Sequence, residues 1–169
     1  MTSPASTGPM ISSPLSRVKR LTGAPSGPII GIDLGTTYSC VAVVKGGKPQ
    51  VVPSREGHNT IPSIVALNQR NALVVGHPAK AQLATNPRNT VFAAKRLVGR
   101  PFVSDVVQRV KGEFLYEIVE GHDGEAAVRL GSEVWSLQHL SAMILVEAKD
   151  QASAFHGVEV QRAVNTVPA

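Results

Sequence analysis

The stretch that decides the fold reads Ile29-Ile30-Gly31-Ile32-Asp33-Leu34-Gly35-Thr36-Thr37-Tyr38-Ser39-Cys40, and Val41-Ala42-Val43-Val44 follows it directly. A first apolar strand ends on a carboxylate, a Gly-Thr-Thr turn reverses the chain, and a second apolar strand returns. A turn of this kind can gather backbone amides into a concave nest that binds anions. The stretch therefore predicts a phosphate-binding turn, and with it one half of a nucleotide site.

The residue types of this turn fit that chemistry. Gly35 can adopt backbone angles closed to other residues, so that the amides after it turn inward together, and Thr36 and Thr37 add hydroxyl groups. Asp33 would repel a phosphate unless a cation stood between them, and Mg²⁺ is typically held by one or two carboxylates together with substrate phosphates. The alternative is an ordinary hairpin turn. Against it, the turn is longer than a tight hairpin needs, and its strands are too apolar for a solvated edge.

Three later segments of the sequence are informative together with the first. Residues 56–63 read EGHNTIPS, residues 86–100 read NPRNTVFAAKRLVGR, and residues 163–169 read AVNTVPA. In order and spacing the four segments resemble the seventy-kilodalton heat-shock chaperones of the DnaK type, from about Ile29 to Ala169 and least between Pro101 and Trp135. The resemblance implies an α/β fold, namely one lobe of an actin-like (ribonuclease H-like) ATPase with a mixed sheet, antiparallel hairpins, a crossover helix and a small outer subdomain.

The resemblance also implies roles for single residues. Asp33 would organise a hydrated Mg²⁺, and Lys95 would reach the terminal phosphate of ATP and its attacking water. The residues implied for contact with ATP or ADP are Gly35, Thr36, Thr37, Tyr38 and Lys95, and those implied for catalysis are Asp33, Thr36 and Lys95. A lysine can offset the charge on a transferring phosphoryl group. From the residues alone, a solvated pair at a helix end is the simpler interpretation of Lys95 and Arg96.

Composition limits the other classes of function. The 169 residues are 43% hydrophobic, which suffices for one globular unit with its own core. The net charge of +5 falls to +2 without Arg17, Lys19 and Arg20, which all precede the first acidic residue, Asp33. Only 4% of the residues are aromatic, and no basic strip interleaved with aromatic residues offers bases a stacking surface. We therefore expect no nucleic-acid partner.

Membrane insertion, disulfide formation and a zinc site are not expected. No apolar run is long enough to span a bilayer, so we expect a soluble protein without a membrane partner. The single cysteine, Cys40, lies in an apolar run and is expected to be a small buried hydrophobic residue. The histidines show no paired ligand spacing; they are His58, His77, His122, His139 and His156.

Residues 1–28 differ in composition from the rest of the chain. They are rich in Ser, Thr, Pro and Gly, and we expect a disordered tail followed by a folded unit over residues 29–169. Their basic, acid-free character, with Ile11, Leu15 and Val18 at helical spacing, also fits an organelle-targeting peptide, although Pro14 interrupts such a helix. The sequence favours the plain extension and a cytoplasmic location.

Apolar periodicity and turn residues predict the secondary structure. The expected strands cover 29–33, 40–44, 50–52, 63–67, 73–75, 113–119, 126–130, 133–136 and 163–167, and the expected short helices cover 78–85, 90–97 and 104–110. A long amphipathic helix is expected from Leu137 to about Phe155, with Ser136 as its N-cap and Gly157 at its end. This helix would cross over the sheet to a parallel strand.

The resemblance sets the expected function. The match stops before the family's second phosphate motif, adenosine motif and peptide-binding domain, so we expect a truncated or fragmentary ATP-binding lobe with little ATPase activity alone, because such a cleft binds by burial from both sides. Full-length relatives would use ATP in protein folding and bind unfolded polypeptides, a J-domain co-chaperone and a nucleotide exchange factor. Two alternatives stay open: a non-catalytic interaction module that keeps the lobe, and another enzyme of this fold such as a sugar kinase, which is not expected to share residues 89–96.

Overall fold

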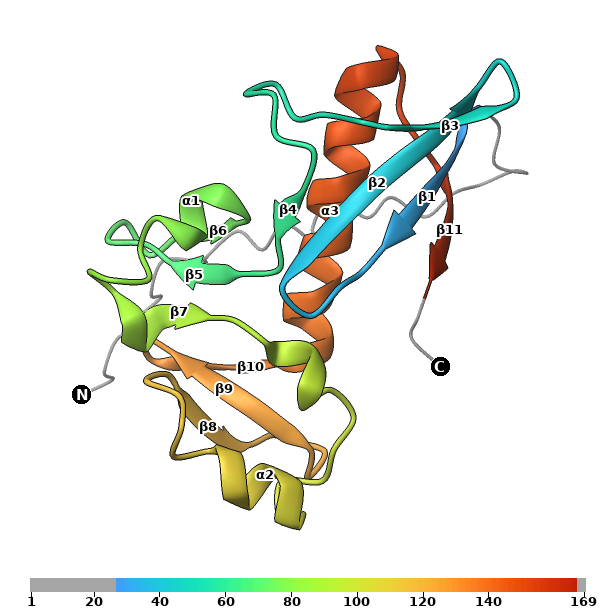
Figure 1. The fold of residues 1–169 in the computed structure, drawn as a ribbon. Helices are drawn as coiled ribbons and strands as arrows, with labels where there is room; N and C mark the ends of the chain where they lie inside the picture. Colours follow the sequence, from blue (N-terminus) through green and yellow to red (C-terminus); the bar gives the residue numbers. More distant parts are fainter. Residues whose placement is uncertain (1–26, 167–169) are drawn as a thin grey trace, which may run out of the picture.

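Parallel and antiparallel pairing combine in the sheet that carries the predicted phosphate turn (Figure 1). The computed structural model describes residues 27–166, so the predicted tail lies almost entirely outside the described residues. The strand order is β11 (Arg162–Thr166), β1 (Ile29–Asp33), β2 (Tyr38–Lys45) and β3 (Lys48–Val51), and β4 (Ile61–Pro62) pairs with β2. β11 is parallel to β1, whereas β2 is antiparallel to β1, β3 and β4.

One face of this sheet packs on the long helix α3 (Leu137–His156). Ile30 and Ile32 of β1 alternate with exposed residues and form a buried cluster with Ala148 and Ala152 of α3, which are fully buried. Alternation with period two places one set of strand side chains on the helix side. Because α3 connects β10 to β11, which is parallel to β1, the predicted crossover is confirmed.

Two smaller sheets lie at the other end of α3 (Figure 1). One has the order β6 (Leu73–Val75), β5 (Val65–Leu67), β7 (Thr90–Val91), and the other has the order β10 (Glu133–Ser136), β9 (Ala126–Leu130), β8 (Glu117–Glu120). The remaining elements are the α-helices α1 (His77–Lys80) and α2 (Asp105–Val110) and the 3₁₀ turns η2 (Pro87–Asn89) and η3 (Ala94–Arg96). These sheets share a second core with the first half of α3, which includes Leu137, Leu140 and Met143.

Most predicted elements are present, but the helix predicted over residues 90–97 is wrong. Thr90–Val91 instead form β7 on the free edge of β5, and a 3₁₀ turn follows. Between the two, Ala93 has a φ of 54°, which an α-helix cannot accommodate. The predicted helix over 78–85 is also shorter than expected, and the predicted strand over 63–67 contributes only β5.

The ends of α3 follow the predicted capping pattern. The Ser136 hydroxyl accepts a hydrogen bond from the backbone N–H of His139 at 3.2 Å. Gly157 terminates the helix with a φ of 68°, a left-handed conformation that favours glycine. Both caps identified in the sequence are therefore confirmed.

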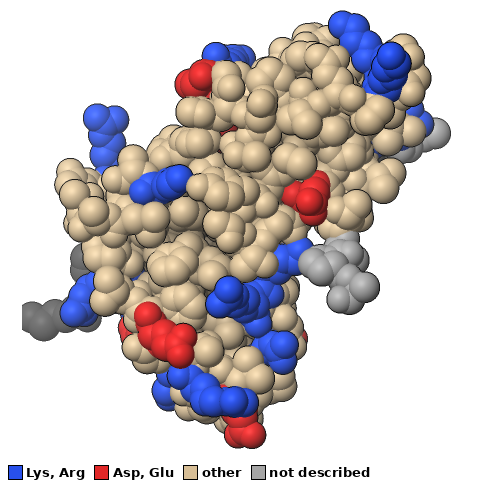
Figure 2. All heavy atoms as spheres, viewed as in Figure 1, with Lys and Arg blue, Asp and Glu red and all other residues tan. Residues whose placement is uncertain are grey.

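Charged and apolar surface are distributed unevenly over the molecule. On the face seen in Figure 2, charged side chains gather at the end that carries α2 and β8, while the middle of that face is largely uncharged. Over residues 27–166, no helix has both the length and the apolar character needed to cross a bilayer. The same residues contain no group of three or more His, Cys, Asp and Glu side chains placed to hold a metal ion.

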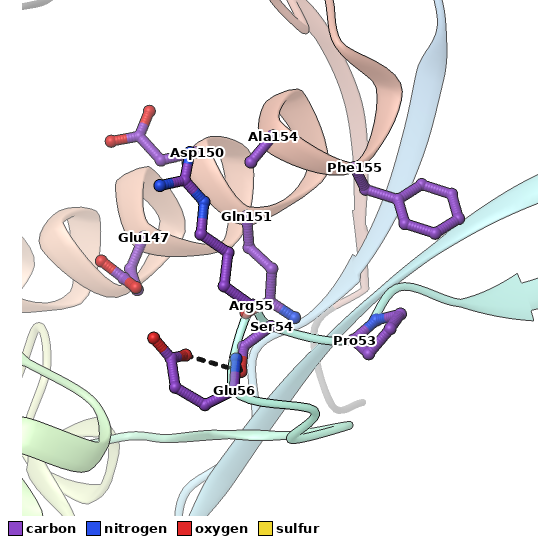
Figure 3. A pocket seen from close by; sticks show the side chains of 9 residues that line it. All are labelled: Pro53, Ser54, Arg55, Glu56, Glu147, Asp150, Gln151, Ala154 and Phe155. Carbon is purple, nitrogen blue, oxygen red and sulfur yellow. Dashed lines mark hydrogen bonds between the residues drawn. The ribbon is translucent and has the colours of Figure 1, made fainter.

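A groove between α3 and the segment after β3 is lined by three carboxylates and by the guanidinium of Arg55 (Figure 3). Gln151 of α3 donates a hydrogen bond to the Val52 carbonyl at 2.6 Å, and Glu56 accepts one from Ser54 at 2.9 Å. The cavity has a volume of about 390 Å³ and is lined by Glu56, Glu147 and Asp150 among others. Burial raises the pKa of Glu147, and the negative charges of Asp150 and Glu56 raise it further. With three carboxylates against the one guanidinium of Arg55, the groove has a net negative charge and does not suit a phosphate.

The raised pKa of Glu147 predicts a pH-dependent cost in stability. The folded chain binds this proton more tightly than the unfolded chain, so stability is lost as pH rises above the ordinary value of 4.5 through the folded-state pKa. We expect Glu147→Gln to raise the free energy of unfolding near neutral pH by roughly 0.5 kcal/mol or less. The groove removes only part of the water around Glu147, and the side chain stays exposed enough for solvent to screen its charge. Urea unfolding of the wild type and the variant, at neutral pH and at a pH below 4.5, measures this difference in the free energy of unfolding.

The gain should vanish at the acidic pH, where both states are protonated. Glu133→Gln is the matched control, since Glu133 is an exposed glutamate of β10 outside the groove. An equal gain at both pH values would contradict the electrostatic explanation.

Candidate functional site

The turn between β1 and β2 brings two backbone segments unusually close. Asp33 is the last residue of β1 and lies opposite the half-buried Cys40 of β2, and four residues, 34–37, connect the strands. A Cβ atom on Gly35 would lie 2.0 Å from the carbonyl oxygen of Tyr38. The φ of Gly35 is not positive, so the expected reason for glycine, unusual backbone angles, is replaced by the close approach of Tyr38. Cys40 is also less buried than predicted.

Ser63 braces this turn from the segment between β4 and β5. Its backbone N–H donates to the Thr37 carbonyl at 2.9 Å, and its hydroxyl donates to the Gly35 carbonyl at 2.8 Å. The same hydroxyl lies 2.9 Å from that of Ser39, and both serines are buried. The sequence assigned no role to Ser63, and its place in the EGHNTIPS segment is the signal that could have identified it.

The carbonyls of Gly35 and Thr37 are thus occupied, whereas the amides of the turn stay available within the described part of the chain. Among residues 27–166, no backbone hydrogen bond outside the strands and helices has the N–H of Gly35, Thr36 or Thr37 as its donor. Buried or partly buried backbone amides normally find an acceptor. Neighbouring amides without one are suited to binding an anion.

The side chain of Lys95 contacts this turn. Lys95 belongs to η3, is half-buried, and donates a hydrogen bond from its Nζ to the Leu34 carbonyl. A cavity of about 10 Å³ separates Gly35, Thr36 and Lys95 from Ser141 and Ile144 of α3. The alternative interpretation, a solvated pair at a helix end, holds for the exposed Arg96 in the last turn of η3, whereas Lys95 is half-buried and bonded to the β1–β2 turn.

A second lysine reaches the turn from α1. Lys80 donates from its Nζ to the Tyr38 hydroxyl at 2.9 Å, and the Nζ lies 5.2 Å from the centre of the Tyr38 ring. Thr36, Thr37 and Tyr38 line a hollow of about 240 Å³ beside this lysine. The sequence analysis did not identify Lys80, because nothing in the chain order places α1 beside β2. Two cationic groups thus border the turn.

Asp33 lies at the opposite edge of the turn, beside β11. It is exposed, and its Oδ1 accepts a hydrogen bond from the Thr166 hydroxyl at 3.1 Å. The parallel pairing of β1 with β11 creates this contact, since Asp33 lies directly opposite Thr166. A single exposed carboxylate fits a hydrated Mg²⁺ that also contacts phosphate better than a site in which protein groups surround the ion.

The structure therefore gathers most of the predicted site residues. Gly35, Thr36 and Lys95 meet at one small cavity, and Thr37 and Tyr38 share the adjoining hollow with Thr36. Asp33 lines neither of these hollows, and its carboxylate contacts Thr166. A turn with available amides, bordered by two lysines and one carboxylate, can bind a phosphate group and the cation that accompanies it.

Comparison with known proteins identifies the family of this chain. A family profile described as Hsp70 protein matches residues 29–169. The mitochondrial 70 kDa heat shock protein of Solanum tuberosum is 47% identical over 141 residues, which make up 83% of this chain and 21% of that protein. The chain thus spans about a fifth of the length of this relative. The matched residues include the turn, η3 and β11, and the chain belongs to the Hsp70 family.

Proposed function

We propose that residues 29–169 form part of the ATP-binding lobe of an Hsp70-type chaperone and hold the outer phosphates of magnesium-bound ATP or ADP. The observation that carries the proposal is the β1–β2 turn, which Lys95 and Lys80 border on two sides. Its Gly35, Thr36 and Thr37 amides have no backbone acceptor within residues 27–166. Membership of the Hsp70 family, which in general binds these nucleotides with Mg²⁺, supports it. The actin-like ATPase fold of this lobe is part of the same proposal.

Each site residue has a distinct role in this proposal. The amides and hydroxyls of Thr36 and Thr37 bind phosphate oxygens, and Gly35 and Tyr38 shape the turn around them. Asp33 holds Mg²⁺ through bound water, and the ion offsets the charge of the phosphates. Lys95 lies next to the turn and supplies positive charge where negative charge accumulates during phosphoryl transfer. The proposed catalytic residues are Lys95, Asp33 and Thr36.

For the full-length protein we propose the chaperone activity of the Hsp70 family. Because the chain covers 21% of the relative, ATP-driven protein folding, unfolded clients, a J-domain co-chaperone and a nucleotide exchange factor are proposed for the full-length protein. In the family the nucleotide lies between two lobes, and residues 29–169 match the first. We therefore expect weak nucleotide binding and little ATP hydrolysis from these residues alone.

The cellular compartment of the protein is either the cytoplasm or an organelle in this proposal. The sequence favours the cytoplasm, whereas the Solanum tuberosum relative is mitochondrial by its name. The basic, acid-free residues before Asp33 fit an organelle-targeting peptide as well as a plain extension. Both compartments are compatible with the Hsp70 family.

Calorimetric titration of the 169-residue chain with ATP in the presence of Mg²⁺ tests nucleotide binding. We expect measurable heat with a dissociation constant weaker than about 10 μM, since one wall of a cleft buries little of the ligand. Absence of binding at millimolar nucleotide would favour the non-catalytic interaction module. Tighter binding by this chain would contradict the argument that a second wall is needed.

Replacing Asp33 should separate the magnesium contribution from the rest. Asp33→Asn keeps the size of the side chain and removes its charge, so we expect ATP affinity to lose its dependence on Mg²⁺. Magnesium-free binding should stay equal or become stronger, because the carboxylate no longer repels the phosphates. Titrations with Mg²⁺ and with EDTA measure the two conditions. Asp105→Asn, at an exposed aspartate of α2, is the control. A magnesium dependence that survives in Asp33→Asn would refute the metal assignment.

A methyl group at Gly35 should damage the turn selectively. Gly35→Ala places Cβ at 2.0 Å from the Tyr38 carbonyl oxygen, so the turn must open and the amides lose their common orientation. We expect nucleotide affinity to fall about tenfold or more, as for the loss of charge-assisted hydrogen bonds. Gly112→Ala is the matched control, because its Cβ would meet no atom within 4 Å. Equal affinities of the two variants would show that the turn does not bind the nucleotide.

A further inference from the structure

The Tyr116 hydroxyl is one of the contacts between the β8–β10 hairpins and the segment that carries Lys95. Tyr116, directly before β8, is 1% exposed, and its hydroxyl donates a hydrogen bond to the Phe92 carbonyl at 2.7 Å. Phe92 lies only three positions before Lys95 in the sequence, whereas Tyr116 is 24 residues away from Phe92. Burial raises the pKa of Tyr116, which keeps its hydroxyl protonated and able to donate.

The residue after Phe92 has a backbone conformation that needs support. Ala93 has a φ of 54° and a ψ of 18°, in the left-handed region that residues with a Cβ atom rarely occupy. Such a conformation persists when the surrounding structure fixes both sides of it. On one side the Phe92 carbonyl is held by Tyr116, and on the other side Leu97 is fully buried and the Arg96 amide donates to the Ala93 carbonyl at 3.1 Å.

The direction of the chain at Ala93 decides where Lys95 points. η3 starts at Ala94, so a rotation at Ala93 turns the whole 3₁₀ segment. With the observed angles, the Lys95 amine reaches the Leu34 carbonyl in the phosphate turn. A change of the Ala93 angles would move the Lys95 amine away from Gly35 and Thr36, which line the same small cavity.

We propose that Tyr116 is a positioning residue, whose hydroxyl holds the Phe92 carbonyl and thereby keeps the left-handed turn at Ala93 in the orientation that delivers the Lys95 amine to the phosphate turn. This inference rests on the proposed function only for the claim that Lys95 meets a phosphate. The positioning itself is a property of the nucleotide-free chain.

The aromatic ring of Tyr116 has a separate, purely structural task. It stacks on Phe114 with ring centres 4.7 Å apart and meets the edge of Phe92 at 5.8 Å. A phenylalanine would preserve these contacts, whereas only the hydroxyl reaches the Phe92 carbonyl. Tyr116→Phe therefore removes the positioning contact and leaves the packing in place.

The accessibility of the Lys95 amine measures its position directly. The 169-residue chain is treated with a limiting amount of an acetylating reagent, and the rate at each lysine is read by mass spectrometry. In Tyr116→Phe we expect the Lys95 rate to rise about threefold or more, because the segment opens locally more often. The rate at Lys48, which is exposed on β3, should not change. An unchanged Lys95 rate in folded Tyr116→Phe would overturn the inference.

Phe114→Leu distinguishes positioning from general packing. This variant loses the ring stack of Phe114 on Tyr116 and its edge contact with Phe92 at 5.5 Å, and it keeps the Tyr116 hydroxyl. We expect it to lower the melting temperature more than Tyr116→Phe does while leaving the Lys95 rate near that of the wild type. A rise at Lys95 equal to that in Tyr116→Phe would show that packing, not the hydrogen bond, sets the lysine position.

Variants at Ala93 test the same inference from the other side. Ala93→Val keeps Tyr116 but disfavours the left-handed conformation, so it should raise the Lys95 rate by itself. Ala93→Asn favours that conformation and should restore slow labelling in the Tyr116→Phe background. Failure of both effects would contradict the role assigned to the Ala93 turn.

Labelling with and without Mg²⁺ and ATP separates this inference from the proposed function. If nucleotide leaves the Lys95 rate of the wild-type chain unchanged, the phosphate role of Lys95 fails, whereas the effect of Tyr116→Phe in nucleotide-free protein stands. If nucleotide protects Lys95 and Tyr116→Phe has no effect, the positioning role fails alone.

Discussion

The packing of α3 against two separate cores is the constraint on which the rest of the structure depends. Its first half is buried with the two small sheets, and its second half is buried against β1 and β2. The change between the cores occurs between Ile144 and Ala148. Small side chains at Ala148 and Ala152 let the strands approach the helix closely, so large substitutions there would separate strand from helix. The β1–β2 turn ends beside this changeover, where Ser141 and Ile144 border the cavity that Lys95 shares with Gly35.

This arrangement explains how a short turn becomes a preformed site. Ser63 ties the carbonyls of Gly35 and Thr37 to the segment between β4 and β5, so the turn does not need a ligand to take its shape. Charge reaches the turn from independent elements, since Lys95 comes from η3 and Lys80 from α1. A site held by several elements loses little conformational entropy on binding, which favours affinity. The groove at Glu147 shares no lining residue with the two hollows at the turn, and its net charge is negative where theirs is positive.

Sequence patterns predicted local structure well wherever periodicity and capping agreed. The alternating residues of β1, the Ser136 and Gly157 caps of α3 and the crossover to β11 all follow from local rules. The prediction was wrong over residues 90–97, where strand pairing and a left-handed residue determine the structure instead of helical propensity. Thr90–Val91 found an unpaired strand edge at β5, and the left-handed turn at Ala93 ended any helix before η3. Edge pairing depends on which strands meet, and no window of sequence contains that information.

The sequence by itself determined the family, the apolar strands on both sides of the Gly-Thr-Thr turn, and the residue types that suit phosphate and magnesium. Only the tertiary structure decided why Gly35 must be a glycine, because the limiting contact is a carbonyl three residues further along a folded turn. It also decided which groups hold the turn and Lys95. Ser63, Lys80 and Tyr116 contact the site from distant parts of the chain. Their roles follow from distances in space, which composition and spacing along the sequence do not specify.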